Sequence, residues 1–286
     1  MTTIAETLDV ARSNLYEEKE TRPSRHNLTE TRRYYKKAED AFFVPLIRKI
    51  VDARPTYGYR RVTALLSRYL EERGNPRVNH KRVYRIMKIN RLLLQRYTGK
   101  PTRTHDGTIT TRTSNLRWCS DIFEIPCWNS ERIRIAFSLD CCDREVMSYI
   151  ATTGGINGAM IQDLVAEAVE SRFGFVDHLP HTIEWLSDNG SAYTARDTRA
   201  FAESLGLSLC TTPVRSPESN GMAEAFVKTF KRDYVHVNPR PDAHSVLEQL
   251  PGWFEDYNEY HPHKGLNMKS PRQYRRSINK LDECPI

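Results

Sequence analysis

Three acidic residues have the positions and spacing expected of a metal-dependent phosphoryl-transfer site. Asp121 lies inside a predicted strand, 117–125, and Asp188 directly follows a later apolar run, 182–186. Glu224 lies in the first turn of a predicted helix, and 35 residues separate it from Asp188. Three converging carboxylates repel one another unless a cation lies among them, and such oxygen ligands suit Mg²⁺ or Mn²⁺. Two ions could activate water or a 3′-hydroxyl for in-line attack on phosphorus.

Each of these acids also has an ordinary structural explanation. An Asp after a strand is commonly a turn residue, and a Glu in the first turn of a helix complements the helix dipole. Three further acids, Asp140, Asp143 and Glu124, lie close to the first strands. Asp140 is the strongest competitor, because it ends a strand near Asp121. We interpret these three as neighbours of the site rather than members of it.

The elements that would position the acids follow from hydrophobic periodicity. Short β-branched or aromatic runs predict three antiparallel strands, after which helical and strand patterns alternate. The predicted strands are 117–125, 131–140, 146–152, 182–186 and 207–210, and the predicted helices are 158–172, 194–205, 221–235 and 243–260, the last interrupted near Pro251. This order predicts a mixed-sheet α/β domain whose first and fourth strands are neighbours, which would bring Asp121 beside Asp188.

The N-terminal part of the chain has a different charge and a different pattern. Residues 1–113 hold 25 Lys and Arg against 12 Asp and Glu, whereas the remainder holds 18 against 24. Apolar residues at helical spacing predict three helices ahead of residue 97, with Asn79 capping the third in a helix-turn-helix arrangement. A basic helix of this kind fits a major groove, although a solvated basic face is the plain alternative. The predicted DNA contacts are Lys81, Arg82, Arg85 and Lys88.

Other features of the sequence exclude several classes of protein. No apolar run is long enough to span a membrane, and the N-terminus lacks the pattern of a signal peptide, so we expect a cytoplasmic protein. The six cysteines form no CxxC pair, which argues against a disulfide framework and a structural zinc site. His261 and His263 flank Pro262, but two histidines without further ligands are weak evidence for a metal.

The spacing of the three acids and several longer segments carry a resemblance to a known family. The segments are 54–66 (RPTYGYRRVTALL), 79–93 (NHKRVYRIMKINRLL), 117–125 (RWCSDIFEI), 139–145 (LDCCDRE), 184–193 (EWLSDNGSAY), 214–234 (VRSPESNGMAEAFVKTFKRDY) and 257–274 (YNEYHPHKGLNMKSPRQY). Together they resemble the DDE transposases of bacterial insertion sequences, relatives of retroviral integrases, and in particular the catalytic second reading frame.

The resemblance implies an RNase H-like core in which Asp121, Asp188 and Glu224 ligate Mg²⁺ or Mn²⁺, with two ions at the site. It supports Lys228 and Lys231, on one face of the predicted helix, as contacts to the DNA end. It further implies a transposase that binds terminal inverted repeats and target DNA as a homo-oligomer. The implied reactions are strand cleavage followed by strand transfer, in a bacterial, nucleoid-associated protein.

Pattern and resemblance together predict the domain organisation. We expect a partial helix-turn-helix and basic linker at 1–37, a helical DNA-binding domain at 38–97 and a linker at 98–114. An RNase H-like catalytic core at 115–240 and a helical extension at 241–286 complete the chain. Because the first segment looks like half of a module, we expect full end recognition to need a fused upstream frame.

Two other functions stay open at this point. An RNase H-like nuclease would cut DNA without joining it, and a DNA-binding regulator would carry an inactive core. The presence of all three acids speaks against the regulator. The basic helical domain and Lys228 with Lys231 favour joining over simple hydrolysis.

Overall fold

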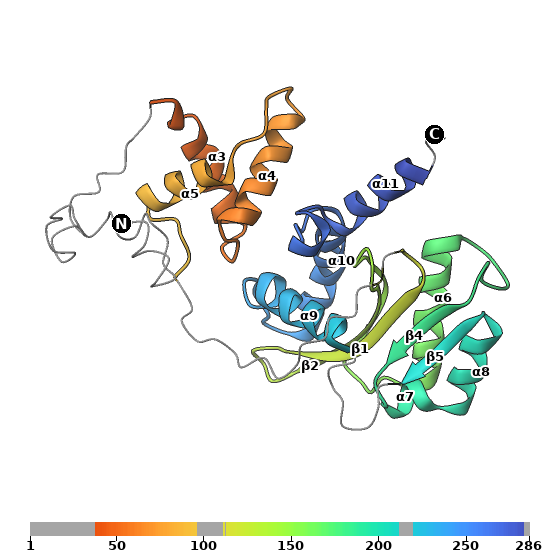
Figure 1. The fold of residues 1–286 in the computed structure, drawn as a ribbon. Coiled ribbons are helices and arrows are strands. Elements are labelled where there is room, and N and C mark those ends of the chain that lie inside the picture. Colours follow the sequence, from red (N-terminus) through yellow and green to blue (C-terminus); the bar gives the residue numbers. More distant parts are fainter. Residues whose placement is uncertain (1–37, 96–110, 112, 212–219, 283–286) are drawn as a thin grey trace, which may run out of the picture.

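The computed structural model describes residues 38–95, 111, 113–211 and 220–282 (Figure 1). The predicted partial helix-turn-helix at 1–37 and most of the linker at 98–114 lie outside these residues. The first described part is a small helical bundle with its own apolar core. Its elements are η2 (Ala38–Asp40), α3 (Phe43–Ala53), α4 (Tyr59–Glu71) and α5 (His80–Ile89). The core side chains include Ile47, Val62, Leu66, Val83, Ile86 and Met87.

The start of α5 confirms the predicted helix cap. The side-chain oxygen of Asn79 accepts a hydrogen bond of 2.8 Å from the backbone N–H of Lys81. This bond satisfies one of the N–H groups that a helix leaves without an internal partner at its first turn. Helix α5 therefore starts at His80, directly after the predicted cap.

A five-stranded mixed sheet forms the centre of the second part. The strands are β1 (Arg117–Pro126), β2 (Arg132–Asp140), β3 (Val146–Thr152), β4 (Ile183–Ser187) and β5 (Leu207–Thr211). Their order across the sheet is β3-β2-β1-β4-β5. The first three strands are antiparallel, whereas β4 runs parallel to both β1 and β5. The predicted adjacency of the first and fourth strands is confirmed.

Helices cover both faces of this sheet (Figure 1). One face packs against α6 (Gly158–Phe173), α7 (Ser191–Thr194) and α8 (Arg196–Ser204). The other packs against α9 (Gly221–Phe230), its π-helical continuation (Lys231–Val235) and α10 (Ala243–Glu259). After η5 (Lys264–Leu266), helix α11 (Pro271–Asp282) ends the described chain. No helix of the described ranges has the length and apolarity to cross a membrane.

Two helix predictions need correction. Helix α10 passes through Pro251 without interruption, because Val246, Leu250 and Trp253 on both sides of the proline bury apolar surface in the core. This packing outweighs the loss of one helical hydrogen bond, which costs about 3 kcal/mol. The predicted helix 221–235 changes to π-helical geometry after Phe230. The predicted helix 194–205 corresponds to α8, which a separate short helix, α7, precedes.

The helical bundle docks on the second part through polar contacts of α4 and the turn before it. Arg61 donates a hydrogen bond of 2.9 Å to Asp233, whose side chain is 1% exposed. The hydroxyl of Tyr57 lies 2.8 Å from Nδ1 of His261. Because Asp233 belongs to the π-helical continuation of α9, the bundle contacts the same helical segment that carries Glu224.

Candidate active site

The register of β1 and β4 brings the two predicted aspartates together. Cys119 and Leu186 are partners across these parallel strands, and both pack in the core on the α9 side of the sheet. Asp121 follows Cys119 by two residues within β1, and Asp188 follows Leu186 by two residues, directly after β4 ends at Ser187. Side chains two residues apart in a strand share a face, and adjacent strands lie about 4.8 Å apart. Asp121 therefore faces α9, and Asp188 lies at the adjacent end of β4.

Helix α9 places Glu224 over the same face. Its aromatic side chains Phe226 and Phe230 pack against Phe123 of β1, with ring centroids 6.4 and 5.8 Å apart respectively. Phe123 lies two residues after Asp121 in the same strand and faces the same side. This packing holds the first turn of α9, which carries Glu224, on the side of β1 that Asp121 faces.

The electrostatics of Asp121 reflect this convergence. Burial raises the pKa of Asp121, and the negative charges of Asp188 and Glu224 raise it further. The backbone N–H of Ile122, which donates to Asp121 over 2.7 Å, and the ammonium group of Lys231 act in the opposite direction. Each carboxylate thus destabilises the ionised form of Asp121, and a cation among them would relieve that repulsion.

The donor chemistry of the three acids suits a hard divalent cation, because all their ligand atoms are carboxylate oxygens. Their spacing does not yet form a ligand cluster: within the described ranges, no three His, Cys, Asp or Glu side chains stand close enough to hold a metal ion. Glu224 has another partner, because its carboxylate lies 3.5 Å from the ammonium of Lys228. This exposed i,i+4 pair is worth only about 0.3–0.5 kcal/mol, so Glu224 can turn away from it at little cost.

The two lysines of the predicted DNA contact lie differently. Lys228 is paired with Glu224, and its side chain is 79% exposed. Lys231 is half-buried, with its ammonium 5.7 Å from the centre of the Phe123 ring. The ammonium of Lys231 lowers the pKa of Asp121 electrostatically. Contact of either lysine with a DNA end stays a prediction.

Two loop residues shape the site by means that the sequence only partly indicated. The backbone N–H of Gly190 donates to Asp188 over 3.0 Å, and a Cβ at Gly190 would lie 2.9 Å from that carboxylate oxygen. The Asp188 carboxylate leaves little room for a Cβ at Gly190, so this turn favours glycine. The side-chain amide of Asn220 donates to the carbonyl of Ser120 over 3.1 Å. The bond ties the start of α9 to the residue before Asp121.

Sequence reasoning missed Tyr193 of α7, the short helix that begins three residues after Asp188. Its side chain is 1% exposed and packs edge-on against Trp185. Burial raises the pKa of Tyr193, and the charges of Asp121 and Asp188 raise it further, so the hydroxyl lies near the pair. Among the groups that the structure describes, this hydroxyl has no hydrogen-bond partner. No periodicity distinguishes such a tyrosine from a plain core residue.

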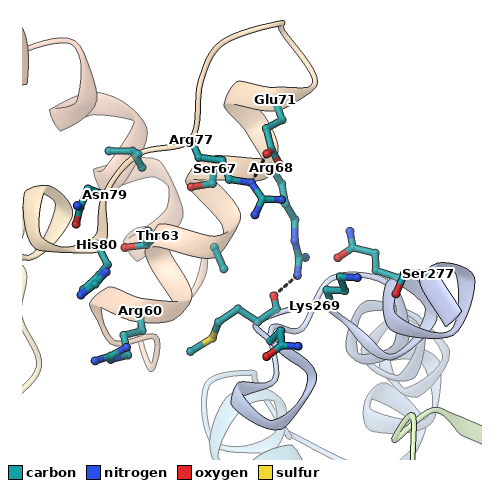
Figure 2. A pocket seen from close by; sticks show the side chains of 15 residues that line it. Arg60, Thr63, Ser67, Arg68, Glu71, Arg77, Asn79, His80, Lys269 and Ser277 are labelled. Carbon is teal, nitrogen blue, oxygen red and sulfur yellow. Dashed lines mark hydrogen bonds and ion pairs between the residues drawn. The ribbon is translucent and has the colours of Figure 1, made fainter. Parts of the chain in front are cut away.

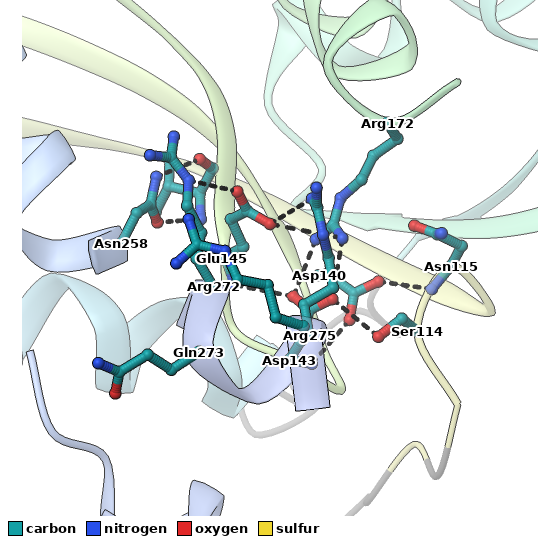
Figure 3. Close-up of polar contacts among 12 residues, drawn as sticks. Ser114, Asn115, Asp140, Asp143, Glu145, Arg172, Asn258, Arg272, Gln273 and Arg275 are labelled. Atoms are coloured by element: carbon teal, nitrogen blue, oxygen red, sulfur yellow. Dashed lines mark hydrogen bonds and ion pairs between the residues drawn. The ribbon is translucent and has the colours of Figure 1, made fainter. Parts of the chain in front are cut away.

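Asp140, the strongest competitor, has a structural role. Its carboxylate accepts three backbone hydrogen bonds, from Asn115, Cys142 and Asp143, between 2.7 and 2.9 Å. Burial and the charge of Asp143 raise the pKa of Asp140 to about 6. Asp143 forms a bidentate ion pair with Arg172 in which both side chains are fully buried. Figure 3 shows Asp143 facing Arg172 of α6 and the neighbouring Glu145 facing Arg272 and Arg275 of α11.

Glu124 and the paired histidines also have structural surroundings. Glu124 accepts from Arg134 over 2.9 Å on the exposed side of β1. Burial lowers the pKa of His261 and that of His263, the latter to about 3, so both rings are neutral at physiological pH. Both rings pack against Tyr257 in the core. The cysteines of β1 and of the turns that follow β1 and β2 are buried free thiols, namely Cys119, Cys127, Cys141 and Cys142.

The predicted DNA contacts on α5 fall into two groups. Lys81 and Lys88 are exposed on the helix. Arg82 and Arg85 are instead turned toward η2, where each donates a hydrogen bond of 2.7 Å to Asp40. Arg82 also lies over the ring of Phe43 at 4.6 Å. A contact between DNA and either arginine would have to compete with a carboxylate that is already in place.

Comparison with known proteins identifies the family. An HTH-like domain model matches residues 37–100, and two integrase core domain models match residues 112–217 and 205–271. The transposase InsD for insertion element IS2A/D/F/H/I/K of Escherichia coli is 52% identical over 242 residues, which are 83% of this chain and 80% of that protein. The transposase InsD for insertion element IS2-9 of strain K12 has the same identity and is covered over 78% of its length.

Likenesses among solved structures are looser. A chain of the simian T-cell lymphotropic virus intasome aligns with a TM-score of 0.47 and 17% identity, over 80% of this chain and 73% of that chain. The catalytic domain of Mos1 mariner transposase aligns with a TM-score of 0.42 and 21% identity, over 59% and 78%. On the identity of 52% over most of both sequences, the protein belongs to the family of insertion-element transposases, polynucleotidyl transferases with an HTH-like domain ahead of an RNase H-like integrase core.

Proposed function

We propose that this transposase binds the terminal inverted repeats of an insertion sequence and cuts and joins DNA strands with Asp121, Asp188 and Glu224 as its metal ligands. The observation that supports this most is the parallel pairing of β1 with β4, which brings Asp121 beside Asp188, the residue that directly follows β4. The negative charges of Asp188 and Glu224 raise the pKa of Asp121, which supports a site where the three carboxylates act on one another. Carboxylates that raise one another's pKa in this way are concentrated at functional sites.

The metal ions of the proposal are two Mg²⁺ or Mn²⁺ ions. When bound, they supply activation of the attacking oxygen and stabilisation of the leaving oxygen. Asp121 and Asp188 provide the preformed half of the site, and Glu224 joins them by leaving its exposed pair with Lys228. That release frees the ammonium of Lys228 for a phosphate of the DNA end, beside Lys231.

The proposed reaction is two phosphoryl transfers at one site. Water first attacks a phosphodiester at the end of the element, and the bond that breaks leaves a 3′-hydroxyl. That hydroxyl then attacks a phosphodiester of the target, so one bond forms for each that breaks. Lys228 and Lys231 hold the reacting end in line, which is a positional contribution to the rate. No covalent bond to the protein is needed.

End recognition is assigned to the helical bundle. We propose that α5 enters the major groove and that Lys81 and Lys88 contact DNA, with Arg82 and Arg85 as further contacts if Asp40 releases them. Two ends of one element must be processed together, so we propose a homo-oligomer assembled on the DNA. Target DNA would approach the exposed face beside Lys228.

The test is a cleavage and joining assay on the inverted repeats that flank this reading frame. Asp121→Asn, Asp188→Asn and Glu224→Gln should each abolish both reactions with Mg²⁺ while leaving end binding nearly unchanged. Asp197→Asn, an exposed acid in the first turn of α8, is the matched control and should keep full activity. A variant that keeps a tenth of the wild-type rate has lost only about 1.4 kcal/mol of barrier stabilisation. Its residue would then not be a ligand, and Asp140→Asn would be tested next.

The same assay separates the alternatives. Strands that are cut but never joined would identify a hydrolytic nuclease. Ends that are bound in the presence of Mg²⁺ or Mn²⁺ without any nick would identify a regulator with an inactive core. Joined products identify a transposase reaction.

A further inference from the structure

A groove of about 680 Å³ separates the helical bundle from the end of the chain (Figure 2). One wall is α4 with the start of α5, and the other is the segment after η5 with the first turns of α11. Arg60, Arg68, Arg77 and His80 line the first wall, and Lys269 lines the second. The groove is therefore built by segments that lie far apart in the sequence.

Direct bonds fix the two walls relative to one another. Arg68 donates to the backbone carbonyl of Tyr260 over 2.9 Å and to that of Met268 over 2.7 Å. The second wall turns sharply at Asn267 and Met268, which both have positive φ, at 54° and 63°. Such residues are uncommon outside glycine, and each is tolerated only where surrounding contacts hold it. The groove is thus present before any ligand arrives.

The side chains that line the groove carry a net positive charge. Four cationic side chains line it, and among the described lining residues Glu71 is the one acid. Glu71 is paired with Arg77, which leaves the charges of Arg60, Arg68 and Lys269 without a carboxylate in the groove. Arg68 bonds to carbonyl groups, which orient it without neutralising it. An anion would be attracted from both walls at once.

The position of the groove identifies the kind of anion. The capping residue Asn79 and the first residue of α5, His80, lie in its wall. In a helix-turn-helix protein the first residues of the recognition helix contact base edges, while the preceding helix crosses the backbone. A duplex held by α5 would therefore run its phosphate backbone along α4 and past Lys269.

We propose that this groove binds the phosphodiester backbone of duplex DNA, with Arg60 of α4 and Lys269 of the C-terminal segment contacting phosphates from opposite walls. The proposal rests on the proposed end binding by α5 and extends it to a second part of the chain. Because the segment of Lys269 is bonded to Arg68 and continues into α11, the contact would fix the direction in which DNA leaves the bundle.

Backbone contacts do not depend on sequence, so the test uses a fluorescently labelled duplex of arbitrary sequence and the full chain. The measured quantity is the slope of log binding constant against log salt concentration, which is negative and loses about 0.9 of its magnitude for each lost phosphate contact. The variants are Lys269→Gln and Arg60→Gln. The matched control is Lys264→Gln, an exposed lysine of η5 that lies outside the groove.

We expect each groove variant to reduce the magnitude of the slope by about 0.9 and the double variant to reduce it by about 1.8, while the control stays at the wild-type value. Lys269→Arg should keep the wild-type slope, because it keeps the charge. Thermal unfolding of Lys269→Gln should match the wild type within about 0.5 kcal/mol, as for other surface changes, which rules out misfolding as the cause.

Equal slopes for Lys269→Gln and Lys264→Gln would overturn the proposal, whether both fall or neither does. If Lys81→Gln weakens binding in that case, end binding by α5 stands and only the groove is wrong. If the wild type binds no duplex, end binding fails as well. Tighter, Lys269-dependent binding of polyglutamate than of duplex would assign the groove to an acidic polypeptide and overturn the proposal too.

Discussion

Asp40 holds two arginines that the proposed DNA-binding helix could otherwise present to phosphates, so Asp40→Asn is the most informative change in the bundle. The carboxylate is 10% exposed and accepts hydrogen bonds of 2.7 Å from Arg82 and from Arg85. A hydrogen bond to a charged group contributes about 1.5–3 kcal/mol to stability. Asparagine keeps one acceptor oxygen but loses the charge and brings an N–H group against a guanidinium.

The expected loss of folding free energy is therefore about 2–3 kcal/mol at neutral pH. For a chain of this size that corresponds to a fall in Tm of about 4–12 °C. Burial raises the pKa of Asp40, but the bonds from Arg82 and Arg85 outweigh burial and lower it below its usual value. A lowered pKa gives stability that is present above the pKa of the unfolded chain and is lost as the pH falls through the folded value. The difference between wild type and variant should accordingly shrink in acid.

Calorimetry or circular dichroism across pH measures this difference, and duplex binding at several salt concentrations measures its consequence. Freed arginines should steepen the salt dependence by up to about 0.9 for each one that reaches a phosphate. An unchanged Tm at neutral pH, or a difference that persists equally in acid, would refute the reasoning. An unchanged salt slope would restrict the DNA contacts of α5 to Lys81 and Lys88.

Three further changes have expected outcomes. Arg172→Met should destabilise the protein by about 3–5 kcal/mol in denaturant unfolding, because it leaves the fully buried Asp143 carboxylate without its partner, and a loss below about 0.5 kcal/mol would contradict this. Tyr193→Phe should raise stability by about 1 kcal/mol, because it removes a buried hydroxyl that lacks a partner among the described groups, whereas a lower Tm would show that the hydroxyl is bonded. Lys228→Ala and Lys231→Ala should reduce strand joining more than overall DNA affinity, and an equal loss of binding to unrelated DNA would make them part of a general basic surface.

Much of the fold could be predicted because its elements repeat at fixed periods. The alternation around Asp121 and the short apolar run before Asp188 locate β1 and β4, and the order of elements makes them neighbours. The pairing of Cys119 with Leu186 then places Asp121 and Asp188 two residues further along each chain. Asn79 was predicted as a cap from its type and place alone, since local chemistry decides a cap.

The remaining features depend on contacts between distant residues. Helix α10 continues through Pro251 because core packing outweighs a local preference, and Asn220 bonds to β1 because that strand lies beside it. The pairing of Arg82 and Arg85 with Asp40 joins residues more than forty positions apart, which a charge count reads only as a basic face. The same holds for Lys269, whose neighbours in the groove come from α4 and α5.

Metal-directed cleavage of the protein tests most directly whether the three acids form one metal site. Fe²⁺ takes the place of Mg²⁺, ascorbate and peroxide generate radicals at the bound iron, and the fragments are mapped along the chain. One site made by Asp121, Asp188 and Glu224 predicts cuts near all three residues together, suppressed by excess Mg²⁺ and lost together in Asp188→Asn. Cuts near only one of these acids, or around Asp140 and Asp143 instead, would contradict a shared site.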